Sequence, residues 1–542
     1  METTIESWWA LPLAAAASKC GVSSPLNLLS FSLLLMLSWL ATVFLHWAHQ
    51  GGPAWGKHWL GRPRDAGSQP IPGPRGFPVI GAMGLMAGLA HRNLADAADR
   101  LGARRLMAFS LGETRVIVAS HQDVAREILN RSAFADRPIK ETAYGLMFHR
   151  AIGFAPYGAY WRKLRTIAAT HLFCPRQIVG SEARRLEIAA DMVEALARRL
   201  SDGGGGFRVR EILKRASLNN IMGSVFGKKY ELFGESEEVR ELRGLVDEGY
   251  ELLGKLNWSD HLPVLAGLDL QRIRYRCSRL VPRVKRFVNR IIDEHLGRTG
   301  TGKQTGDFVD ILLSLHGSEK LSDLDMVAVL WEMIFRGTDT VAVLIEWVLA
   351  RLILHPNVQA KAQAELDLVV GRSRPVAEAD VAKLTYTQGV IKEVLRMHPP
   401  GPLLSWARLA TSDTTVDGWH VPAGTTAMVN MWAIMRDPHV WVQPEEFAPE
   451  RFLSEGGAKA TVEMEFSVLG SDLRIAPFGS GRRSCPGKAL ALTTVGFWVA
   501  TLLHEYTWRA SDGVAVDLTE VLRLSCEMAS PLTVTVCSRR GL

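Results

Sequence analysis

The stretch Phe478-Gly-Ser-Gly-Arg-Arg-Ser-Cys-Pro-Gly487 places one thiol, Cys485, after a glycine-rich approach and beside two cations. Glycine lets the backbone come close to a bulky partner at φ values that other residues resist. Pro486 is favoured at the first position of a helix, where amide donors would point back toward the sulfur. These features predict a depressed pKa for the Cys485 thiol. Such a thiolate can be a nucleophile, a redox sensor or a metal ligand.

Composition indicates one large domain in a reducing compartment. The 542 residues are 47% hydrophobic, which is enough to bury a large core, and no internal repeat divides the chain. Six cysteines, at positions 20, 174, 277, 485, 526 and 537, form no Cys-x-x-Cys pair, which argues against a disulfide framework or a zinc site. The net charge of +7 is moderate and is not gathered in a tail, so nucleic acid is not an expected partner.

Residues 26–47 contain no Asp, Glu, Lys or Arg, and about 20 apolar residues suffice for a helix to cross a bilayer. We expect a transmembrane anchor there. A cleaved secretory signal is the alternative, which the length of the run and the acidic residues before it disfavour. Basic residues are more frequent after the run than before it, which predicts a lumenal segment at 1–25 and a cytosolic body.

A proline-rich segment at 70–78 follows the anchor. Proline stiffens a chain, so this segment is expected to act as a hinge within a linker at 48–82. The linker would separate the anchor from a domain at 83–542. Taken alone, the segment is equally typical of an ordinary proline-rich loop.

Hydrophobic spacing predicts a mainly helical fold with small β-sheets. Apolar residues recur at helical intervals over 183–200, 235–253, 280–296, 321–354, 356–370 and 381–397. Shorter runs rich in β-branched residues predict strands at 115–119, 415–421, 426–428 and 532–537.

The predicted helix at 321–354 begins with a capping pair, Ser322 and Asp325, and is interrupted at 336–340 by Arg-Gly-Thr-Asp-Thr. Gly costs a helix about 1 kcal/mol relative to Ala, and a hydroxyl can bond the carbonyl four residues back and bend the axis. The interruption predicts a local distortion that makes room for a small ligand. A kinked core helix with Asp339 facing water is at least as good an interpretation of this segment alone.

Two further constellations place charges on one helix face. Glu393 and Arg396 are three residues apart, as in an ion pair, and Arg451 in a Pro-Glu-Arg-Phe segment could complete a buried triad. Trp161 and Arg165 are four apart and suit a buried carboxylate. Each has a less specific alternative, because most such pairs are exposed ion pairs or surface stacks.

Together, the motifs resemble the cytochrome P450 superfamily of haem-thiolate monooxygenases. The resemblance rests on the cysteine loop, the Glu-x-x-Arg helix, the Pro-Glu-Arg-Phe segment, the Gly-x-Asp-Thr helix and the Trp-x-x-x-Arg helix, which occur in one order from about residue 70 onward. The anchor and proline hinge look like those of the type bound to the endoplasmic reticulum. The stretches 335–340 and 400–408 are similar to the plant subfamily that includes the organ-growth regulator KLUH.

The resemblance implies roles by matching position. Cys485 would be the axial ligand of haem iron, with Thr340 and Asp339 delivering protons. The residues implied to hold the haem b group are Trp161, Arg165, Arg408, Phe478, Gly481, Arg483 and Gly487. The residues implied to brace the cysteine loop are Glu393, Arg396 and Arg451. The expected substrate contacts are Arg336, Phe335, Phe148, Leu403 and Met528.

Arg336 departs from the family pattern, which has Ala or Gly at this position. A cation so close to the expected oxygen groove either crowds the haem or binds an anion. We therefore expect Arg336 to orient the carboxylate of a fatty-acid-like substrate. The alternative, that it turns outward to pair with a neighbouring helix, is about as well supported by the sequence.

The implied reaction inserts one oxygen atom of O2 into a substrate C–H bond, with electrons from NADPH through a membrane-bound NADPH-cytochrome P450 reductase. The chain itself lacks a nucleotide-binding fingerprint. A haem-thiolate isomerase or dehydratase acting on hydroperoxides, and a haem protein without turnover, are the alternatives. The family resemblance further suggests fatty-acid hydroxylation and a role in plant organ or seed growth.

Overall fold

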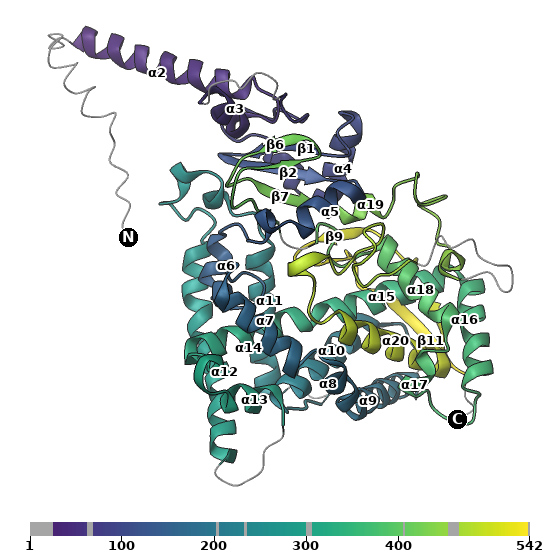
Figure 1. The fold of residues 1–542 in the computed structure, drawn as a ribbon. Coiled ribbons are helices and arrows are strands. Elements are labelled where there is room, and N and C mark those ends of the chain that lie inside the picture. The colour runs from purple at the N-terminus through teal and green to yellow at the C-terminus, as the bar shows by residue number, and fades with distance from the viewer. Residues whose placement is uncertain are drawn as a thin grey trace.

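The computed structural model describes residues 25–61, 69–201, 205–231, 236–299, 306–404, 407–453 and 466–539. Helices make up most of the body, and the strands form four small sheets. Figure 1 shows the helices gathered below a sheet that lies beside the N-terminal helices. The prediction of a mainly α fold with small sheets is confirmed.

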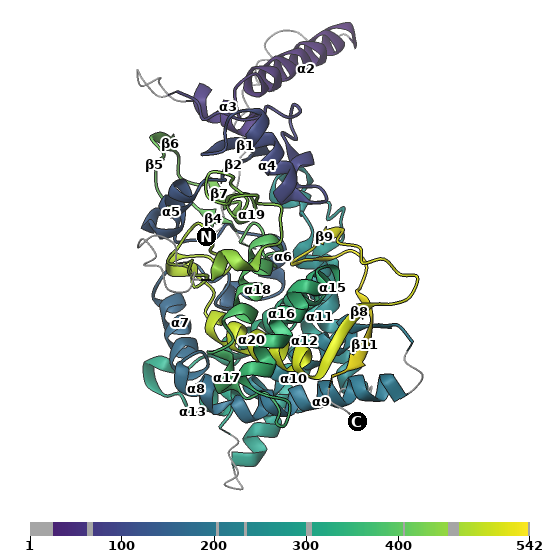
Figure 2. The same cartoon turned by 90° about the vertical axis from the view of Figure 1, so that its right-hand side faces the viewer.

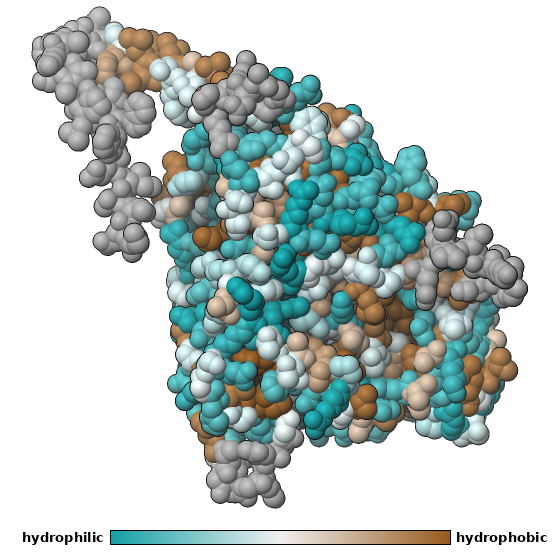
Figure 3. Space-filling view, viewed as in Figure 1, coloured by the Kyte–Doolittle hydropathy of each residue, from teal (hydrophilic) through white to brown (hydrophobic). Residues whose placement is uncertain are grey.

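The N-terminal part contains α2 (Pro25–Trp47) and the short α3 (Pro53–Leu60). Among the described residues, one straight helix, Leu29–Trp47, is long and apolar enough to cross a membrane. Its side chains are largely exposed, and Figures 2 and 3 show it projecting from the body with an apolar surface. This helix could be a membrane anchor, as expected for 26–47, whereas residues 1–24 of the predicted lumenal segment lie outside the described residues.

The helices of the body are α4 (Ala90–Arg100), α5 (Gln122–Asn130), α6 (Glu141–Gly145), α7 (Ala159–His171), α8 (Pro175–Gly180), α9 (Glu182–Ser201), α10 (Val209–Phe226), α11 (Glu237–Gly254), α12 (Ile273–Thr299), α13 (Phe308–Ser314), α14 (Asp323–Gly337), α15 (Asp339–Leu354), α16 (Pro356–Val369), α17 (Glu378–Val381), α18 (Thr385–Met397), α19 (Met431–Ile434) and α20 (Lys488–Glu505). The predicted helices coincide with α9, α11, α12, α14, α15, α16 and α18. Most differences are at helix ends. Helix α12 begins at Ile273 rather than at the predicted residue 280, and the predicted helix 381–397 corresponds to α18 together with the last residue of α17.

The largest sheet has the order β1 (Met107–Leu111), β2 (Thr114–Ala119), β7 (Thr426–Val429) and β4 (Arg408–Leu409). Strand β2 pairs antiparallel with β1 and parallel with β7. A second sheet joins β3 (Phe207–Arg208), β11 (Thr533–Ser538) and β8 (Tyr506–Ala510). The remaining two sheets are the pairs β5 (Thr414–Val416) with β6 (Trp419–Val421), and β9 (Glu520–Leu522) with β10 (Cys526–Met528).

The single strand predicted at 415–421 is a hairpin. Asp417 and Gly418 both have positive φ, 50° and 80°, so the chain reverses between β5 and β6. Asp and Gly tolerate this conformation, and the turn separates two runs that read as one.

The helix predicted at 321–354 is two helices, α14 and α15, with Thr338 between them. The predicted cap is present, because the Ser322 side chain accepts from the Asp325 amide. The break lies against α10, where a Cβ on Gly337 would come within 2.4 Å of Ile221 Cδ1. Close packing of α10 on this glycine therefore accompanies the predicted distortion.

The buried core follows these two helices. Apolar residues of α14 pack with those of α7, α10, α11 and α12, and those of α15 pack with α9, α16, α18 and α20. The prediction that Pro486 opens a helix is wrong, because α20 begins at Lys488 with Gly487 as its N-cap. The break between α14 and α15 and the loop before α20 line the same cavity.

Candidate functional site

A cavity of about 270 Å³ lies between the cysteine loop and the α14–α15 break. Its lining includes residues of the cysteine loop, of the α14–α15 break, of α7 and of α10. The predicted site residues that line it are Cys485, Thr340, Arg336, Trp161, Arg165, Arg408, Phe478, Arg483 and Gly487. Tertiary structure thus brings together predicted site residues from four separate stretches of the chain.

Cys485 lies on the wall of this cavity. Burial raises the pKa of its thiol, while the charge of Arg336 and the amide of Gly487 act in the opposite direction. The predicted depression of the pKa is therefore wrong for the protein alone, because the flanking cations do not outweigh desolvation.

The cavity wall is rich in buried arginines. Burial and the charge of Arg483 lower the pKa of Arg408 to about 9, and burial lowers the pKa of Arg483 to about 10. Arg137, which sequence reasoning missed, lines the same wall, and burial followed by the charges of Arg408 and Arg483 lowers its pKa. Mutual repulsion of guanidinium groups in a buried wall indicates a site that accepts negative charge.

These arginines bind mostly to backbone carbonyls. Arg483 donates to Ala135 O at 2.9 Å and Ala155 O at 2.7 Å, and Arg165 donates to Ser484 O at 3.0 Å. Nη1 of Arg408 has no hydrogen-bond partner within the described chain. A buried guanidinium without a bonded anion fits the donor set that a dicarboxylate such as the haem propionates requires.

Trp161 lines the cavity, and its indole N–H already has a partner within the protein. Its indole Nε1 donates to Ile152 O at 3.1 Å, and its ring lies under the guanidinium of Arg483, 4.4 Å from the ring centroid. Trp161 thus contacts both the backbone at Ile152 and the guanidinium of Arg483. It therefore helps to position Arg483 in the cavity wall.

The two groups proposed for proton delivery are the first two residues of α15, directly after the break, and they have different surroundings. Thr340 lines the cavity. Asp339 is outside the lining, and its carboxylate pairs with Lys214 Nζ at 3.2 Å. Asp339 is therefore positioned between the cavity helix and a partly exposed lysine of α10, rather than facing water alone.

Glu393, Arg396 and Arg451 lie in contact. Arg396 donates to both carboxylate oxygens of Glu393, at 2.8 and 2.9 Å, and Arg451 donates to Oε1 at 3.1 Å. The Glu393 and Arg396 side chains are fully buried. Arg396 also donates to Met435 O at 2.9 Å, so this cluster ties α18 to the segments that follow β7.

Several expected contacts lie outside the cavity lining. Phe335 and Phe148 pack against each other in the core, with ring centroids 5.1 Å apart. Leu403 packs against the β1–β2 side and Met528 packs in the α15 core. Their neighbours Arg336, Leu404 and Ser525 line the cavity instead.

Gly481 also lies outside the lining. Its φ is +67°, and a Cβ there would lie 2.2 Å from Leu129 O. Glycine is thus required by the close approach of the cysteine loop to the end of α5.

Glu332 is a cavity residue that sequence reasoning missed. It lies one helical turn before Arg336 on α14 and lines the cavity with it. The signal available in the sequence was an acid at i−4 from the unusual arginine, in an otherwise apolar run.

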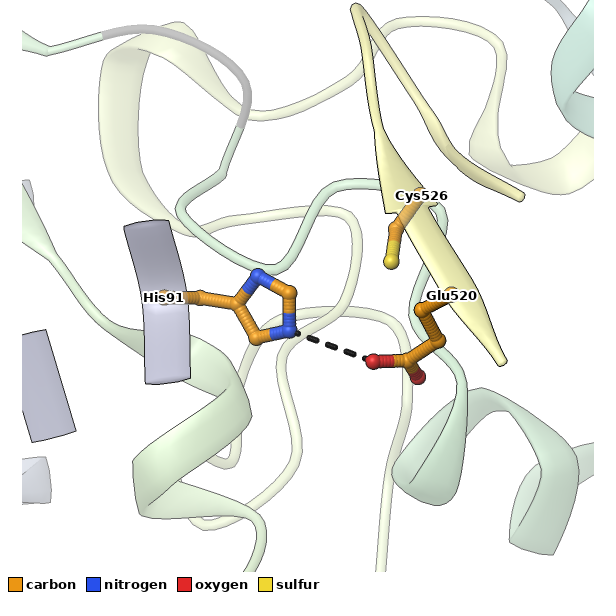
Figure 4. Close-up of side chains that lie close together, drawn as sticks. All are labelled: His91, Glu520 and Cys526. Carbon is orange, nitrogen blue, oxygen red and sulfur yellow. Dashed lines mark ion pairs between the residues drawn. The ribbon is translucent and has the colours of Figure 1, made fainter. Parts of the chain in front are cut away.

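Figure 4 shows a second buried cluster, formed by His91, Glu520 and Cys526, none of which is among the residues that line the cavity. Glu520 Oε2 is 3.4 Å from His91 Nε2, and it also accepts from Arg92 Nη2 at 2.7 Å. Oε1 lies 3.3 Å from His398 Nδ1. The carboxylate is therefore already compensated, and the cluster joins α4 to the β9–β10 pair.

Comparison with known proteins agrees with this arrangement. The family model described as "Cytochrome P450" matches residues 71–528. The chain is 61% identical over 530 residues to "Cytochrome P450 78A3" of Glycine max and 62% identical over 531 residues to "Cytochrome P450 78A9" of Arabidopsis thaliana, with 98% of each chain covered. It is 36% identical to "Flavonoid 3'-monooxygenase" of Arabidopsis thaliana over 487 residues, which is 87% of this chain and 92% of that protein. The chain therefore belongs to the cytochrome P450 family, among the plant 78A members, and is a monooxygenase.

Proposed function

We propose that this monooxygenase hydroxylates a lipophilic substrate of the fatty-acid type. The observation that carries this proposal is Arg336, a cation that lines the cavity together with apolar side chains of α10 and α15 such as Val225 and Leu344. An apolar wall binds an alkyl chain, and a guanidinium binds a carboxylate. From the resemblance to the subfamily that includes a growth regulator, we also propose a role in plant organ or seed growth.

The donor set fits a haem b group, whose iron the Cys485 thiolate would ligate. Arg165, Arg408 and Arg483 would hold the propionates, with Arg137 beside them. Phe478 and Gly487 would lie against the ring, since both line the cavity next to the cysteine. When bound, the haem supplies O2 activation, and a thiolate ligand favours cleavage of the O–O bond.

The remaining steps belong to side chains of this chain. Arg336 would hold the substrate carboxylate, which fixes the alkyl chain along the apolar wall. Thr340 would hold a proton at its hydroxyl and pass it on, and the Asp339 carboxylate would relay a replacement proton from solvent to Thr340. Lys214, which pairs with Asp339, would fix the orientation of that carboxylate.

Electrons would come from NADPH through an NADPH-cytochrome P450 reductase. Exposed cations lie on the cysteine side of the molecule: Arg482, beside the cysteine loop, and Arg162, on α7. A basic face of this kind would attract an acidic partner.

We propose that the protein is anchored by α2 in the endoplasmic reticulum membrane, in a single pass, with the body on the cytosolic face. The apolar helix Leu29–Trp47 supports this. Exposed apolar side chains of the segment before α12, Val264 (81% exposed) and Leu268 (64%), would also favour contact with lipid.

The test is reconstitution of the full chain with a reductase in vesicles, with fatty acids and NADPH. Hydroxylated product that requires both NADPH and reductase supports the proposal, and a Cys485→Ala variant is the control. Turnover of hydroperoxides without reductase would contradict it, as would unlabelled product under ¹⁸O2.

A further inference from the structure

Glu332 and Arg336 form a charged pair on the wall of the cavity. They are four residues apart on α14, so they share one helix face, and Arg336 Nη1 lies 3.7 Å from Glu332 Oε1. Among the lining residues that the structure describes, Glu332 is the one carboxylate. The arginines of the same lining are Arg137, Arg165, Arg336, Arg408 and Arg483.

The two side chains differ in exposure. Both line the cavity, and Glu332 is 2% exposed whereas Arg336 is 38% exposed, so the guanidinium is the more accessible of the two groups. The position of Arg336 in the lining favours the expectation that it faces the cavity.

Glu332 is held in place by the loop that contains Gly153. Its Oε1 accepts from the Gly153 amide at 2.8 Å. Burial raises the pKa of Glu332, while the charge of Arg336 and the amides of Gly153 and Ile152 oppose this shift. These contacts offset part of the cost of burying the carboxylate, whose Oε2 has no hydrogen-bond partner among the described residues.

Gly153 makes room for the pair. A Cβ at this position would lie 2.4 Å from Glu332 Oε1 and 2.5 Å from Arg336 Nη1. The loop is fixed as well, because Arg137 Nε donates to Gly153 O at 3.1 Å. The carboxylate, guanidinium and glycine thus form one built arrangement.

We propose that Glu332 is a positioning residue that acts through Arg336 and sets how strongly the cavity prefers an acid to a neutral lipophile. The proposal rests on the recognition of a carboxylate by Arg336. Because Glu332 Oε1 lies 3.7 Å from the guanidinium, it offsets part of the charge that an incoming carboxylate meets. Loss of the Glu332 charge removes this offset, so binding of the acid strengthens relative to binding of a neutral ester.

The experiment measures dissociation constants of decanoic acid and methyl decanoate by calorimetry at pH 7.5, using haem-loaded full-length protein in nanodiscs. The quantity compared is the ester-to-acid ratio of these constants. Glu332→Gln keeps an oxygen acceptor for the Gly153 amide and removes the charge. We expect the ratio to rise at least fivefold in this variant and to fall to about one in Arg336→Gln.

Two controls isolate the route of the effect. Glu346→Gln removes another buried carboxylate, which pairs with Arg210 at 2.7 Å and lies outside the cavity lining, and it should leave the ratio unchanged. In the double variant Glu332→Gln/Arg336→Gln, the ratio should equal that of Arg336→Gln. A merely structural role of Glu332 would weaken acid and ester binding equally, which leaves the ratio constant.

The outcomes separate this inference from the proposed function. A wild-type preference that Arg336→Gln abolishes but Glu332→Gln leaves within twofold overturns the role of Glu332 and leaves the carboxylate recognition standing. A rise that persists in the double variant also overturns it, because Glu332 would then act without Arg336. A ratio near one in the wild type and in every variant overturns both. A ratio near one in the wild type that rises in Glu332→Gln supports the role of Glu332 and overturns an acid as the native substrate.

Discussion

Two buried charged regions of this molecule are built in opposite ways. In the cluster of Glu393, Arg396 and Arg451, the carboxylate accepts three guanidinium hydrogen bonds at 2.8 to 3.1 Å. In the cavity wall, Arg165 and Arg408 bind backbone carbonyls, and Arg408 Nη1 has no bonded partner among the described residues. The first region satisfies its own charges, whereas the second leaves positive charge for a ligand.

A structural ion cluster and an anion-binding site differ in whether their charges are paired within the protein. Breaking a closed cluster leaves a buried charge unpaired and destabilises the fold. Removing a cation from an open wall relieves repulsion in the ligand-free protein and costs affinity for the anion. The two regions should therefore respond to substitution with opposite signs in stability.

The largest effect is expected at Cys485, which the open wall surrounds. In Cys485→Ser, the red-shifted Soret band of the reduced, carbon-monoxide-bound protein should disappear, and so should hydroxylation, because a serine hydroxyl does not supply a thiolate ligand. Absorption spectroscopy of membranes containing wild type and variant measures this. An unchanged band in the variant would remove Cys485 from the site.

Breaking the closed cluster should be the largest effect on stability. Arg396→Met leaves Glu393 buried without its bidentate partner and should lower the free energy of unfolding by about 3–5 kcal/mol. Denaturant unfolding of the body measures the loss, with Arg482→Met as an exposed control. A loss in unfolding free energy below about 1 kcal/mol would show that the Glu393 carboxylate does not depend on Arg396 for its compensation.

Acid should weaken the buried cluster of His91 and Glu520, in which His398 contacts Glu520. Burial lowers the pKa of His398 to about 4 from a usual 6.5, with hydrogen bonding and charge from Glu520 opposing the shift. The unfolded chain then binds a proton that the folded chain does not, so stability is full above pH 6.5 and falls toward pH 4. Between pH 7 and pH 5 the loss should be about 2 kcal/mol.

Thermal unfolding at both pH values measures this loss, with His398→Asn as the reference. The variant should show a smaller difference in melting temperature between pH 7 and pH 5 than the wild type. An equal difference in both proteins would place the acid sensitivity elsewhere.

The smallest and most diagnostic effect is expected at Arg408 of the open wall. Arg408→Met should raise the stability of the haem-free protein by about 1 kcal/mol, because replacing a buried ion by an apolar side chain of similar size is often stabilising. The same variant should bind haem about tenfold more weakly, since one charge-assisted contact is lost. Haem titration and unfolding of the apoprotein measure the two signs. A variant that loses stability without haem would mean that the wall is closed like the Glu393 cluster.

Local patterns predicted much of the fold. The helix at 183–200 matches α9, and the Ser322 cap is present, because apolar spacing and capping depend on residues within one or two turns. One strand was predicted where Asp417 and Gly418 form a turn, and α20 was predicted to begin at Pro486 rather than at Lys488. Both depend on backbone conformations that neighbouring hydrophobic residues do not report.

Predictions of which side chains face the cavity were less accurate, because a helix rotates by about 100° per residue. Phe335 and Arg336 are adjacent, so they point in different directions; Arg336 lines the cavity and Phe335 packs against Tyr250, 4.5 Å between ring centroids. The sequence therefore identified the part of α14 that lines the cavity, but it did not determine which of the two adjacent side chains faces the cavity.

The sequence by itself determined the chemistry of this protein: a cysteine in a glycine-rich loop, a broken helix with Thr340, and the paired charges whose spacing is local. Tertiary structure alone decided which charges are compensated. The partners of Asp339 and Glu332, namely Lys214 and Gly153, lie more than a hundred residues away along the chain. Electrostatic compensation depends on distance in space and on burial, and neither quantity can be read from spacing along one chain.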